Sequence, residues 1–362
     1  MWGDPGVTEL MQLSENPVAL PALSGGQKSV TLARAGFLKK LRFWMKNELT
    51  VSANTTGPGK SPYGPLAGIQ NIAIKANGQI DLVNLSGLGA TVYNEVQNRD
   101  GSVLAHPAQD TALNVGESAA LATYPTIGDT DTGDIESTYP FEFNFALPVN
   151  IRGRMEEIGL WMLQNQAIDV NINVNFNPLY AATASYDAVY SGGTGITAAD
   201  NGSELQIERE LYEVPADPKN FPRLDWAHQI IEYTQTFTGN FARFEIPRSG
   251  LLLRAIVISL DSNGDPIGYD DLSSLKWIYG ANRTPINRAG DKLAAEYLQD
   301  YNRQPPAGVS VLDFYKWGEQ GLKLVKDTEV LANLRLESNF ATTATGSQRI
   351  ILDRLYPVAA AQ

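Results

Sequence analysis

The chain has 362 residues, of which 43% are hydrophobic and 19% charged, a composition typical of a folded protein long enough for two domains. It has no cysteine, which excludes disulfides, thiolate metal sites and cysteine nucleophiles. Its formal net charge is −12 and it has no cationic tail or stripe, which argues against direct nucleic-acid binding, because Lys and Arg at the phosphates supply that affinity.

The first 28 residues are predicted to form a short N-terminal arm. Its opening, MWGDPGVTELMQLSEN, contains acidic residues and lacks both the basic and the apolar region of a signal peptide. No apolar run in the chain approaches the ~18 residues of a membrane span. We therefore expect a soluble protein that is made in the cytosol.

A strand is predicted next, in LKKLRFWMKNELTVS (38–52). We interpret its basic residues as the solvated side of that strand, at Lys39, Lys40, Arg42 and Lys46. The following stretch, NTTGPGKS (54–61), approaches the phosphate-loop pattern. Asn54 replaces its first Gly, however, Pro58 removes a backbone N–H, and the residues that follow cannot supply the required helix. We interpret this stretch as a loop between strands.

The two halves of the chain repeat the same kinds of element. The stretches PLAGIQNIAIKANGQI (65–80) and PRSGLLLRAIVISLDSNGDPI (247–267) each contain a Pro-x-x-Gly turn, an apolar strand and an Asn-Gly pair. Asn-Gly suits a type I′ hairpin turn, because both of its central residues need a positive φ. A helix-like segment follows in each half, at 152–166 and, more clearly, at 289–304.

Two more strands close each half. AIDVNINVNFNP (167–178) corresponds to TEVLANLRLESNF (328–340), and ELQIERELYEVP (204–215) corresponds to QRIILDRLYPV (348–358). A chance match of one such element is easy, but the same order of four elements is not. The sequence therefore indicates a duplicated β-domain.

The strand at 167–178 has an unusual polar face. Its apolar residues alternate with Asp169 and then only with amides, at Asn171, Asn173, Asn175 and Asn177. Asn is depleted from strands, and the corresponding strand in the second half has charged residues there. Amides can make hydrogen bonds at a contact without the cost of burying charge. We therefore predict that the Asn171–Asn177 face lies against the neighbouring domain, the long loop or another subunit; a plain solvated face is the alternative.

These features predict an all-β fold of two tandem domains with roughly eight strands each, a helix inserted late in each and a short N-terminal arm. The long connections favour a Greek key or a jelly roll, and with the latter the chain would be two tandem eight-stranded jelly rolls (a double jelly roll). The arm is expected at 1–28 and the first jelly roll at 29–215, with a long surface loop at 179–203. The second jelly roll is expected at 224–362. A Pro-rich linker at 216–223 separates them, because prolines cannot continue a strand ladder.

Two acidic loops approach a calcium-binding pattern without completing it. DSNGDP (261–266) has Pro266 where an EF-hand needs Gly, and Leu272 where it needs a bidentate Glu. DTDTGD (129–134) also lacks the final Glu. We interpret each as a turn, with an adventitious cation as the alternative.

The remaining candidates for chemistry are weak. His106 and His228 are the only histidines, so a three-His zinc site is impossible, and no G-x-S-x-G motif supports a hydrolase triad. Glu156 and Glu157 fall in the first turn of the helix-like segment, where acids favour the helix dipole. The six tryptophans are dispersed and are interpreted mainly as core residues. We predict no catalytic, cofactor-binding or metal-binding residue.

The order of these elements carries a resemblance over nearly the whole chain. The strand at 38–52, the Pro-x-x-Gly strand, FEFNFALPVNI (141–151) with a helix after it, and the closing strands occur in one half, and the second half repeats the scheme. In this order the chain resembles the double jelly-roll major capsid proteins of tailless, membrane-containing phages, which are of the tectivirus type and the adenovirus-type capsid lineage.

The resemblance implies a structural protein that is not an enzyme and has no cofactor. It implies homotrimers of pseudo-hexagonal outline that tile an icosahedral shell, so the protein is expected in the virion after synthesis in the host cytoplasm. The implied partners are the chain itself, neighbouring capsomers and minor capsid or penton proteins, without direct contact to nucleic acid. The N-terminal arm, helical at 7–13, would contact neighbouring capsomers or the internal membrane.

Two other functions are open from the sequence. One is a jelly-roll protein that binds carbohydrate or a receptor, and the other is a glycan hydrolase. The first would be expected to have a clustered aromatic platform or a calcium loop, and neither is well formed.

Overall fold

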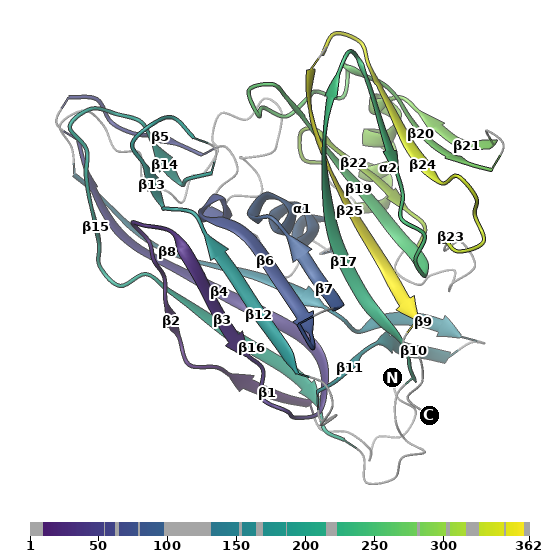
Figure 1. The fold of residues 1–362 in the computed structure, drawn as a ribbon, viewed down its shortest axis with the longest axis horizontal. Coiled ribbons are helices and arrows are strands. Elements are labelled where there is room, and N and C mark those ends of the chain that lie inside the picture. The colour runs from purple at the N-terminus through teal and green to yellow at the C-terminus, as the bar shows by residue number, and fades with distance from the viewer. Residues whose placement is uncertain are drawn as a thin grey trace. The chain divides into compact units, whose positions relative to one another are not determined.

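The computed structural model describes residues 10–53, 55–61, 65–78, 80–97, 132–151, 154–163, 169–185, 187–214, 223–280, 283–301, 305–315, 326–343 and 345–357. Within these ranges the chain is mostly β-strand, with two α-helices, α1 (Gly87–Gln97) and α2 (Gly290–Tyr301), and a short 3-10 helix, η1 (Pro65–Gly68) (Figure 1). No helix in the described residues is long and apolar enough to cross a bilayer.

The chain divides into two compact units. The N-terminal unit comprises residues 8–144 and 161–216, and the C-terminal unit includes residues 145–160 and 217–362. Residues 145–160, inside the range expected for the first jelly roll, therefore belong to the C-terminal unit. The chain last passes from one unit to the other after residue 216, and residues 216–222 of the predicted Pro-rich linker lie outside the described ranges.

In the described residues, the two main antiparallel sheets of the N-terminal unit each have four principal strands. The first has the order β1-β16-β4-β8, with bounds β1 (Leu10–Ser14), β16 (Glu204–Tyr212), β4 (Phe37–Ser52) and β8 (Thr132–Asn144). The second has the order β3-β12-β6-β7, with bounds β3 (Gly26–Thr31), β12 (Val170–Phe176), β6 (Ile69–Ala76) and β7 (Ile80–Leu85). Strands that are far apart in sequence lie side by side in both sheets, which is the topology of a jelly roll.

The C-terminal unit repeats this topology strand for strand. Its first sheet has the order β17-β25-β19-β22, with bounds β17 (Arg223–Thr238), β25 (Thr345–Pro357), β19 (Leu251–Asp261) and β22 (Val309–Asp313). Its second has the order β18-β24-β20-β21, with bounds β18 (Phe241–Glu245), β24 (Arg335–Phe340), β20 (Leu272–Tyr279) and β21 (Arg283–Arg288). The predicted fold of two eight-stranded jelly rolls is confirmed.

This equivalence corrects part of the predicted repeat. The closing strands were matched correctly, because β12 and β24 hold the same place in their sheets, as do β16 and β25. The match between 65–80 and 247–267 was wrong: β6 corresponds to β20, whereas β19 corresponds to β4. Both segments contain an apolar strand near an Asn-Gly pair, but only Asn77 and Gly78, with φ of 50° and 67°, have the two positive values of a type I′ turn.

Among the described residues, each jelly roll has one α-helix, at the same point of the topology. Helix α1 follows β7, and α2 follows the equivalent strand β21. The prediction of a helix at 289–304 is confirmed by α2, whereas the helix predicted at 152–166 is wrong. Its described part forms the strands β10 (Arg154–Gly159) and β11 (Trp161–Met162).

A hairpin replaces that predicted helix because of contacts that are distant in sequence. Strand β9 (Leu147–Ile151) pairs with β10, which runs parallel to β17. Leu147, Val149 and Ile158 on the hairpin pack with residues that follow much later in the chain, Leu253, Tyr315 and Leu355. Gly159 has a φ of +88°, which a right-handed helix does not allow. Burial against the C-terminal unit thus selects strands here.

The described part of the N-terminal segment and the long loop both contain strands that the sequence did not predict. All five residues of β1 pair with β16, so the helix expected at 7–13 is wrong for residues 10–13, and residues 7–9 lie outside the described ranges. The loop at 179–203 contains three short strands. They are β13 (Tyr180–Ala181), β14 (Tyr190–Ser191) and β15 (Thr197–Asp200).

Short strands complete the sheets of both units. In the N-terminal unit, β15 and β11 extend the first sheet by pairing with β4, while β13 and β14 form a separate small sheet with β5 (Gly59–Lys60). Strand β2 (Val18–Ala19) pairs with β16, and in the C-terminal unit β23 (Lys326–Asp327) pairs with β19.

Each unit has an aromatic core between its sheets. In the N-terminal unit Phe43 stacks on Phe141 with ring centroids 4.8 Å apart, and Phe143 meets both rings edge-on. In the C-terminal unit the fully buried Trp277 packs against Phe314. Trp161 is also buried and Trp44 and Trp226 are half-buried, while Trp2 and Trp317 lie outside the described residues.

Candidate functional site

The phosphate-loop-like stretch forms part of a small sheet. Gly59 and Lys60 are strand β5 and pair with β14 of the long loop. The backbone N–H of Ser61 donates to the carbonyl of Val189 at 2.9 Å, and the Ser61 side chain is buried. Backbone groups of this stretch are therefore used in strand pairing, and the interpretation as a loop between strands is wrong at Gly59 and Lys60.

The described parts of the two acidic loops do not gather ligands around a metal position. One oxygen of Asp261 accepts the backbone N–H groups of Asn263 and Asp265, at 2.8 and 2.9 Å, so this carboxylate closes its own turn. In the second loop, residues 132–134 belong to β8, and residues 129–131 lie outside the described ranges. Across the described residues there is no group of three or more His, Cys, Asp or Glu side chains that could hold a metal ion.

His228 belongs to a buried ion cluster that joins three strands of the C-terminal unit. Its Nε2 lies 2.5 Å from one oxygen of Asp353, and the guanidinium of Arg254 lies 2.8 Å from the other. All three side chains are at most 1% exposed. Burial raises the pKa of Asp353, but Arg254 and His228 outweigh burial and hold it below its ordinary value. The cluster is a structural tie between β17, β19 and β25; His106 lies outside the described residues.

Glu156 and Glu157 do not lie in a helix. They belong to β10, where they pair with Val149 and Pro148 of β9, so the helix-dipole explanation for these acids is wrong. Their placement follows from the hairpin, which could not be recognised without its partner strand β17.

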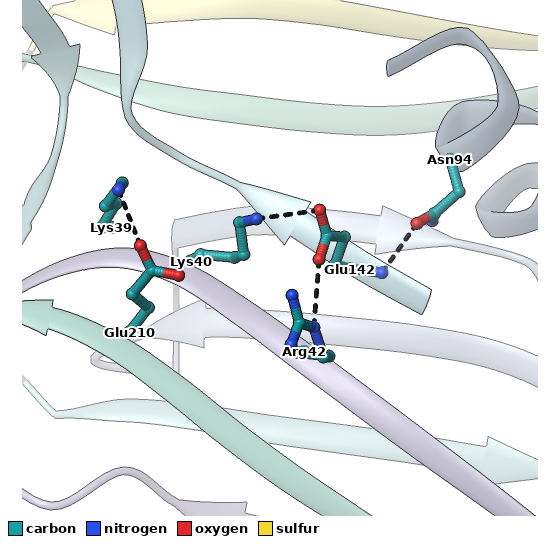
Figure 2. A network of polar contacts seen from close by, with 6 residues as sticks. All are labelled: Lys39, Lys40, Arg42, Asn94, Glu142 and Glu210. Carbon is teal, nitrogen blue, oxygen red and sulfur yellow. Dashed lines mark hydrogen bonds and ion pairs between the residues drawn. The ribbon is translucent and has the colours of Figure 1, made fainter. Parts of the chain in front are cut away.

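Glu142 is the centre of a polar network in the N-terminal unit (Figure 2). Its carboxylate is only 3% exposed. One oxygen forms an ion pair with Lys40 at 3.0 Å, and the other forms one with Arg42 at 3.2 Å. Its backbone N–H donates to the side-chain oxygen of Asn94 on α1 at 2.7 Å. The network therefore joins β4, β8 and α1, and it gives buried polar groups the partners they need.

The network also corrects the interpretation of the basic residues on β4. The side chains of Lys40 and Arg42 are 18% and 26% exposed and bind Glu142, so they are not simply a solvated side. Lys39 pairs with Glu210 on β16 at 2.7 Å. Sequence reasoning missed Glu142, because only strand pairing puts its carboxylate beside two cations.

The asparagines of β12 lie together on one face of the β3-β12-β6-β7 sheet. Residues directly opposite one another in antiparallel strands share a face. Asn171, Asn173 and Asn175 are half-buried. Opposite them and on the next strand along lie Gln27, Ser29 and Thr31 of β3, Asn71, Ala73 and Lys75 of β6, and Asp81 and Asn84 of β7. We call this set, with the three asparagines, the amide face.

Hydroxyl and amide groups are paired across the amide face. Ser29 donates to Asn173 at 2.6 Å and Thr31 donates to Asn171 at 2.7 Å. Asn71 donates to Asn84 on β7. Lys75 and Asp81 are the two charged members and form an ion pair at 3.3 Å, so the face is electrically neutral. The sequence singled out only the asparagines of β12. The other members of the amide face lie on separate strands, so the sequence could not show that they belong to it.

The equivalent face of the C-terminal unit is charged. On β24 the outward positions are Arg335, Glu337 and Asn339, of which the first two are ionic. Arg335 pairs with Glu337 at 2.8 Å. The polar side chains opposite them are Arg243 and Glu245 of β18 and Ser274 and Lys276 of β20. We call β24's three residues and these four the charged face.

Comparison with known proteins gives a match in structure alone. No protein-family model matches the chain, and no curated protein matches it in sequence. Among solved structures, the STIV major capsid protein matches with a TM-score of 0.65 and 14% identity, covering 98% of this chain and 100% of that chain. The major capsid protein P2 of bacteriophage PM2 matches with a TM-score of 0.52 and 12% identity, covering 97% and 99%.

A third match extends this likeness. PBCV-1 VP54 has a TM-score of 0.59 and 11% identity, covering 96% of this chain and 94% of that chain. The chain has the double jelly-roll fold of viral major capsid proteins. The predicted resemblance is therefore confirmed as a likeness of fold, over nearly the whole length of each double jelly roll.

Proposed function

We propose that this protein is a viral major capsid protein, a building block that self-assembles into an icosahedral shell and resides in the virion. The observation that carries the proposal is the full-length match of both jelly rolls, in one chain, to capsid proteins of similar length. Each of those chains is covered at 99% or more, so no extra domain accounts for its function as a capsid protein.

Duplication of the jelly roll supports assembly into trimers. A closed ring of three identical chains with two similar domains each presents six similar lobes, an outline that fills a hexagonal lattice. We infer that the protein forms a homotrimer of this kind, with neighbouring capsomers as its main partners. The shell would be made after synthesis in the host cytoplasm.

Finer partners follow from the same proposal. Minor capsid or penton proteins would occupy the places that a six-lobed trimer does not fit, and the N-terminal segment would contact neighbouring capsomers or an internal membrane. The net charge of −12 supports a role without direct contact to nucleic acid. The protein acts by assembly and not by catalysis.

The mass of the purified full-length chain in solution tests the proposal. Light scattering coupled to size exclusion is expected to return three times the mass of one chain. Electron microscopy at higher concentration, or of particles from the source, is expected to show six-lobed tiles. A stable monomer at all concentrations, combined with specific binding on a glycan array, would contradict the proposal and favour the carbohydrate-binding alternative.

A further inference from the structure

The two jelly rolls differ in the charge of the same face. The amide face and the charged face occupy equivalent sheets, built around the equivalent strands β12 and β24. The charged face has the five ionic residues Arg243, Glu245, Lys276, Arg335 and Glu337, whereas the amide face has only the pair of Lys75 and Asp81. Because the fold of the two sheets is the same, the sheet topology does not explain the difference.

The amide face is neutral on a strongly acidic chain. Its one cation and one anion neutralise each other at 3.3 Å, and at its border Arg34 pairs with Asp169 at 2.7 Å. Two copies of a chain with a net charge of −12 repel each other, and a patch that meets the same patch of another copy adds no further repulsion if it carries no net charge. A neutral face therefore suits a contact between identical patches.

The chemistry of this face is also self-complementary. An amide side chain has both donors and acceptors, as does a hydroxyl, so either can pair with an identical group. A carboxylate or an ammonium group cannot, because it would meet a like charge. In a contact of twofold symmetry the same patch of both subunits meets itself. Amides and hydroxyls suit such a contact, and ionic residues do not.

The hydrogen bonds of the face leave its donors available. Asn171 and Asn173 each use the side-chain oxygen to accept a hydroxyl from β3. Among the described residues, the Nδ2 groups of Asn171, Asn173 and Asn175 have no hydrogen-bond partner. The internal bonds hold two of the amides in place, and their donors are free for another surface.

We propose that the amide face docks on the amide face of a second copy of this chain, as a subunit contact of twofold symmetry. This rests on the proposed function, because it names the surface by which the capsid protein meets itself. The contact joins neutral polar surfaces, so the desolvation that it requires is smaller than for the charged face.

A charge introduced at the centre of the face tests the proposal in the full-length chain. Asn173→Asp has nearly the same shape, keeps an oxygen that accepts from Ser29, and places like charges opposite each other across the contact. Asn339→Asp adds the same charge to the charged face and is the matched control. Asn173→Gln keeps the amide and tests whether the change of charge is responsible. Circular dichroism confirms that each variant is folded.

Self-association is measured by sedimentation against protein concentration. Asn173→Asp is expected to weaken it about tenfold or more, since like charges brought together oppose association. For Asn339→Asp and Asn173→Gln, the self-association constant is expected to stay within about threefold of the wild type. A tenfold change corresponds to about 1.4 kcal/mol. Equal effects of Asn173→Asp and Asn339→Asp in a wild type that assembles would overturn this inference and leave the proposed function standing. A wild type that never associates would overturn both.

The absence of native cysteine allows a second, direct test of location. Asn173→Cys and Asn339→Cys each provide a single thiol. Assembly is expected to slow maleimide labelling at position 173 about tenfold and to leave position 339 unchanged, because only a covered thiol is protected. A flexible bis-maleimide is expected to link two chains through position 173. Equal labelling at both positions, or protection without a link between copies, would overturn the twofold contact.

Discussion

The two jelly rolls have the same strand order and differ in how their polar groups are used. In the N-terminal unit the buried carboxylate of Glu142 binds two cations that still reach solvent, 18% and 26% exposed. In the C-terminal unit Asp353 binds Arg254 and His228, and all three are buried. The outer faces differ as well, one neutral and one ionic. A duplicated fold thus constrains strand order and core, while the polar groups of each copy can diverge.

The largest expected effect comes from removing the buried carboxylate of the C-terminal unit, and the buried carboxylate of the N-terminal unit serves as its comparison. Asp353→Asn removes the charge that faces both Arg254 and His228 in a dry interior, and we expect it to lower the free energy of unfolding by about 3–5 kcal/mol. Glu142→Gln is expected to cost only about 1–2 kcal/mol, because Lys40 and Arg42 can turn to water. Denaturant unfolding of the full chain measures the total loss of stability in each variant. Hydrogen exchange of the amides in β25 and in β8 shows which unit has lost stability. Equal losses of stability in the two variants would show that solvent access of the paired cations does not reduce the cost of removing the carboxylate.

A smaller effect is expected at glycines with positive φ. In Gly159→Ala the new Cβ would lie 2.7 Å from the carbonyl oxygen of Phe145 and 3.1 Å from the Cβ of His228, so we expect a loss of about 2–3 kcal/mol. Gly78→Ala, in the β6–β7 turn with nothing within 4 Å of the added atom, is the matched control and should cost about 1 kcal/mol. Thermal unfolding measures both. A control that loses as much as Gly159→Ala would show that φ alone decides.

The smallest effect concerns the turn between β24 and β25, which replaces the long loop of the other copy. Asp271 accepts hydrogen bonds from the backbone N–H and the hydroxyl of both Thr342 and Thr343. Burial raises the pKa of Asp271, but these hydrogen bonds outweigh it and lower the pKa below its ordinary 3.8.

This depressed pKa stabilises the folded chain above pH 3.8, and the contribution is lost as the pH falls through the lower folded value. Asp271→Asn is expected to cost about 1 kcal/mol at neutral pH and to lose that part of the acid dependence. Unfolding measured between about pH 2 and 7 tests this. If the stability of the variant depends on pH as the wild type's does, the ionisation of Asp271 does not contribute to the stability of the folded chain.

Much of the fold was accessible from local pattern. The alternation at 170–176 predicted β12 and its buried face, and the spacing of Leu293, Tyr297 and Tyr301 predicted α2, where all three are buried. Helix α1 was missed because GLGATVYNEVQ has two glycines and no amphipathic stripe, and every one of its residues is buried. Its start is capped by Ser86, which accepts the backbone N–H of Gly89.

The sequence predicted only part of the amide face. The sequence showed that the polar side of β12 is unusual, since Asn at positions 171, 173 and 175 is visible without a structure. It did not show that Ser29 and Thr31 lie beside those amides, because β3 and β12 are about 140 residues apart in the chain. Whether another subunit covers the face stays a prediction.

By itself, the sequence indicated two copies of one β-domain, because the closing strands of each half can be recognised from local patterns that recur in the same order. Only the tertiary structure decided that 145–160 is a hairpin of the C-terminal unit, that β6 corresponds to β20, and which groups face Glu142 and the amides. The reason is physical: a strand acquires its partners, its register and its neighbouring charges from segments far along the chain, and no local pattern specifies them.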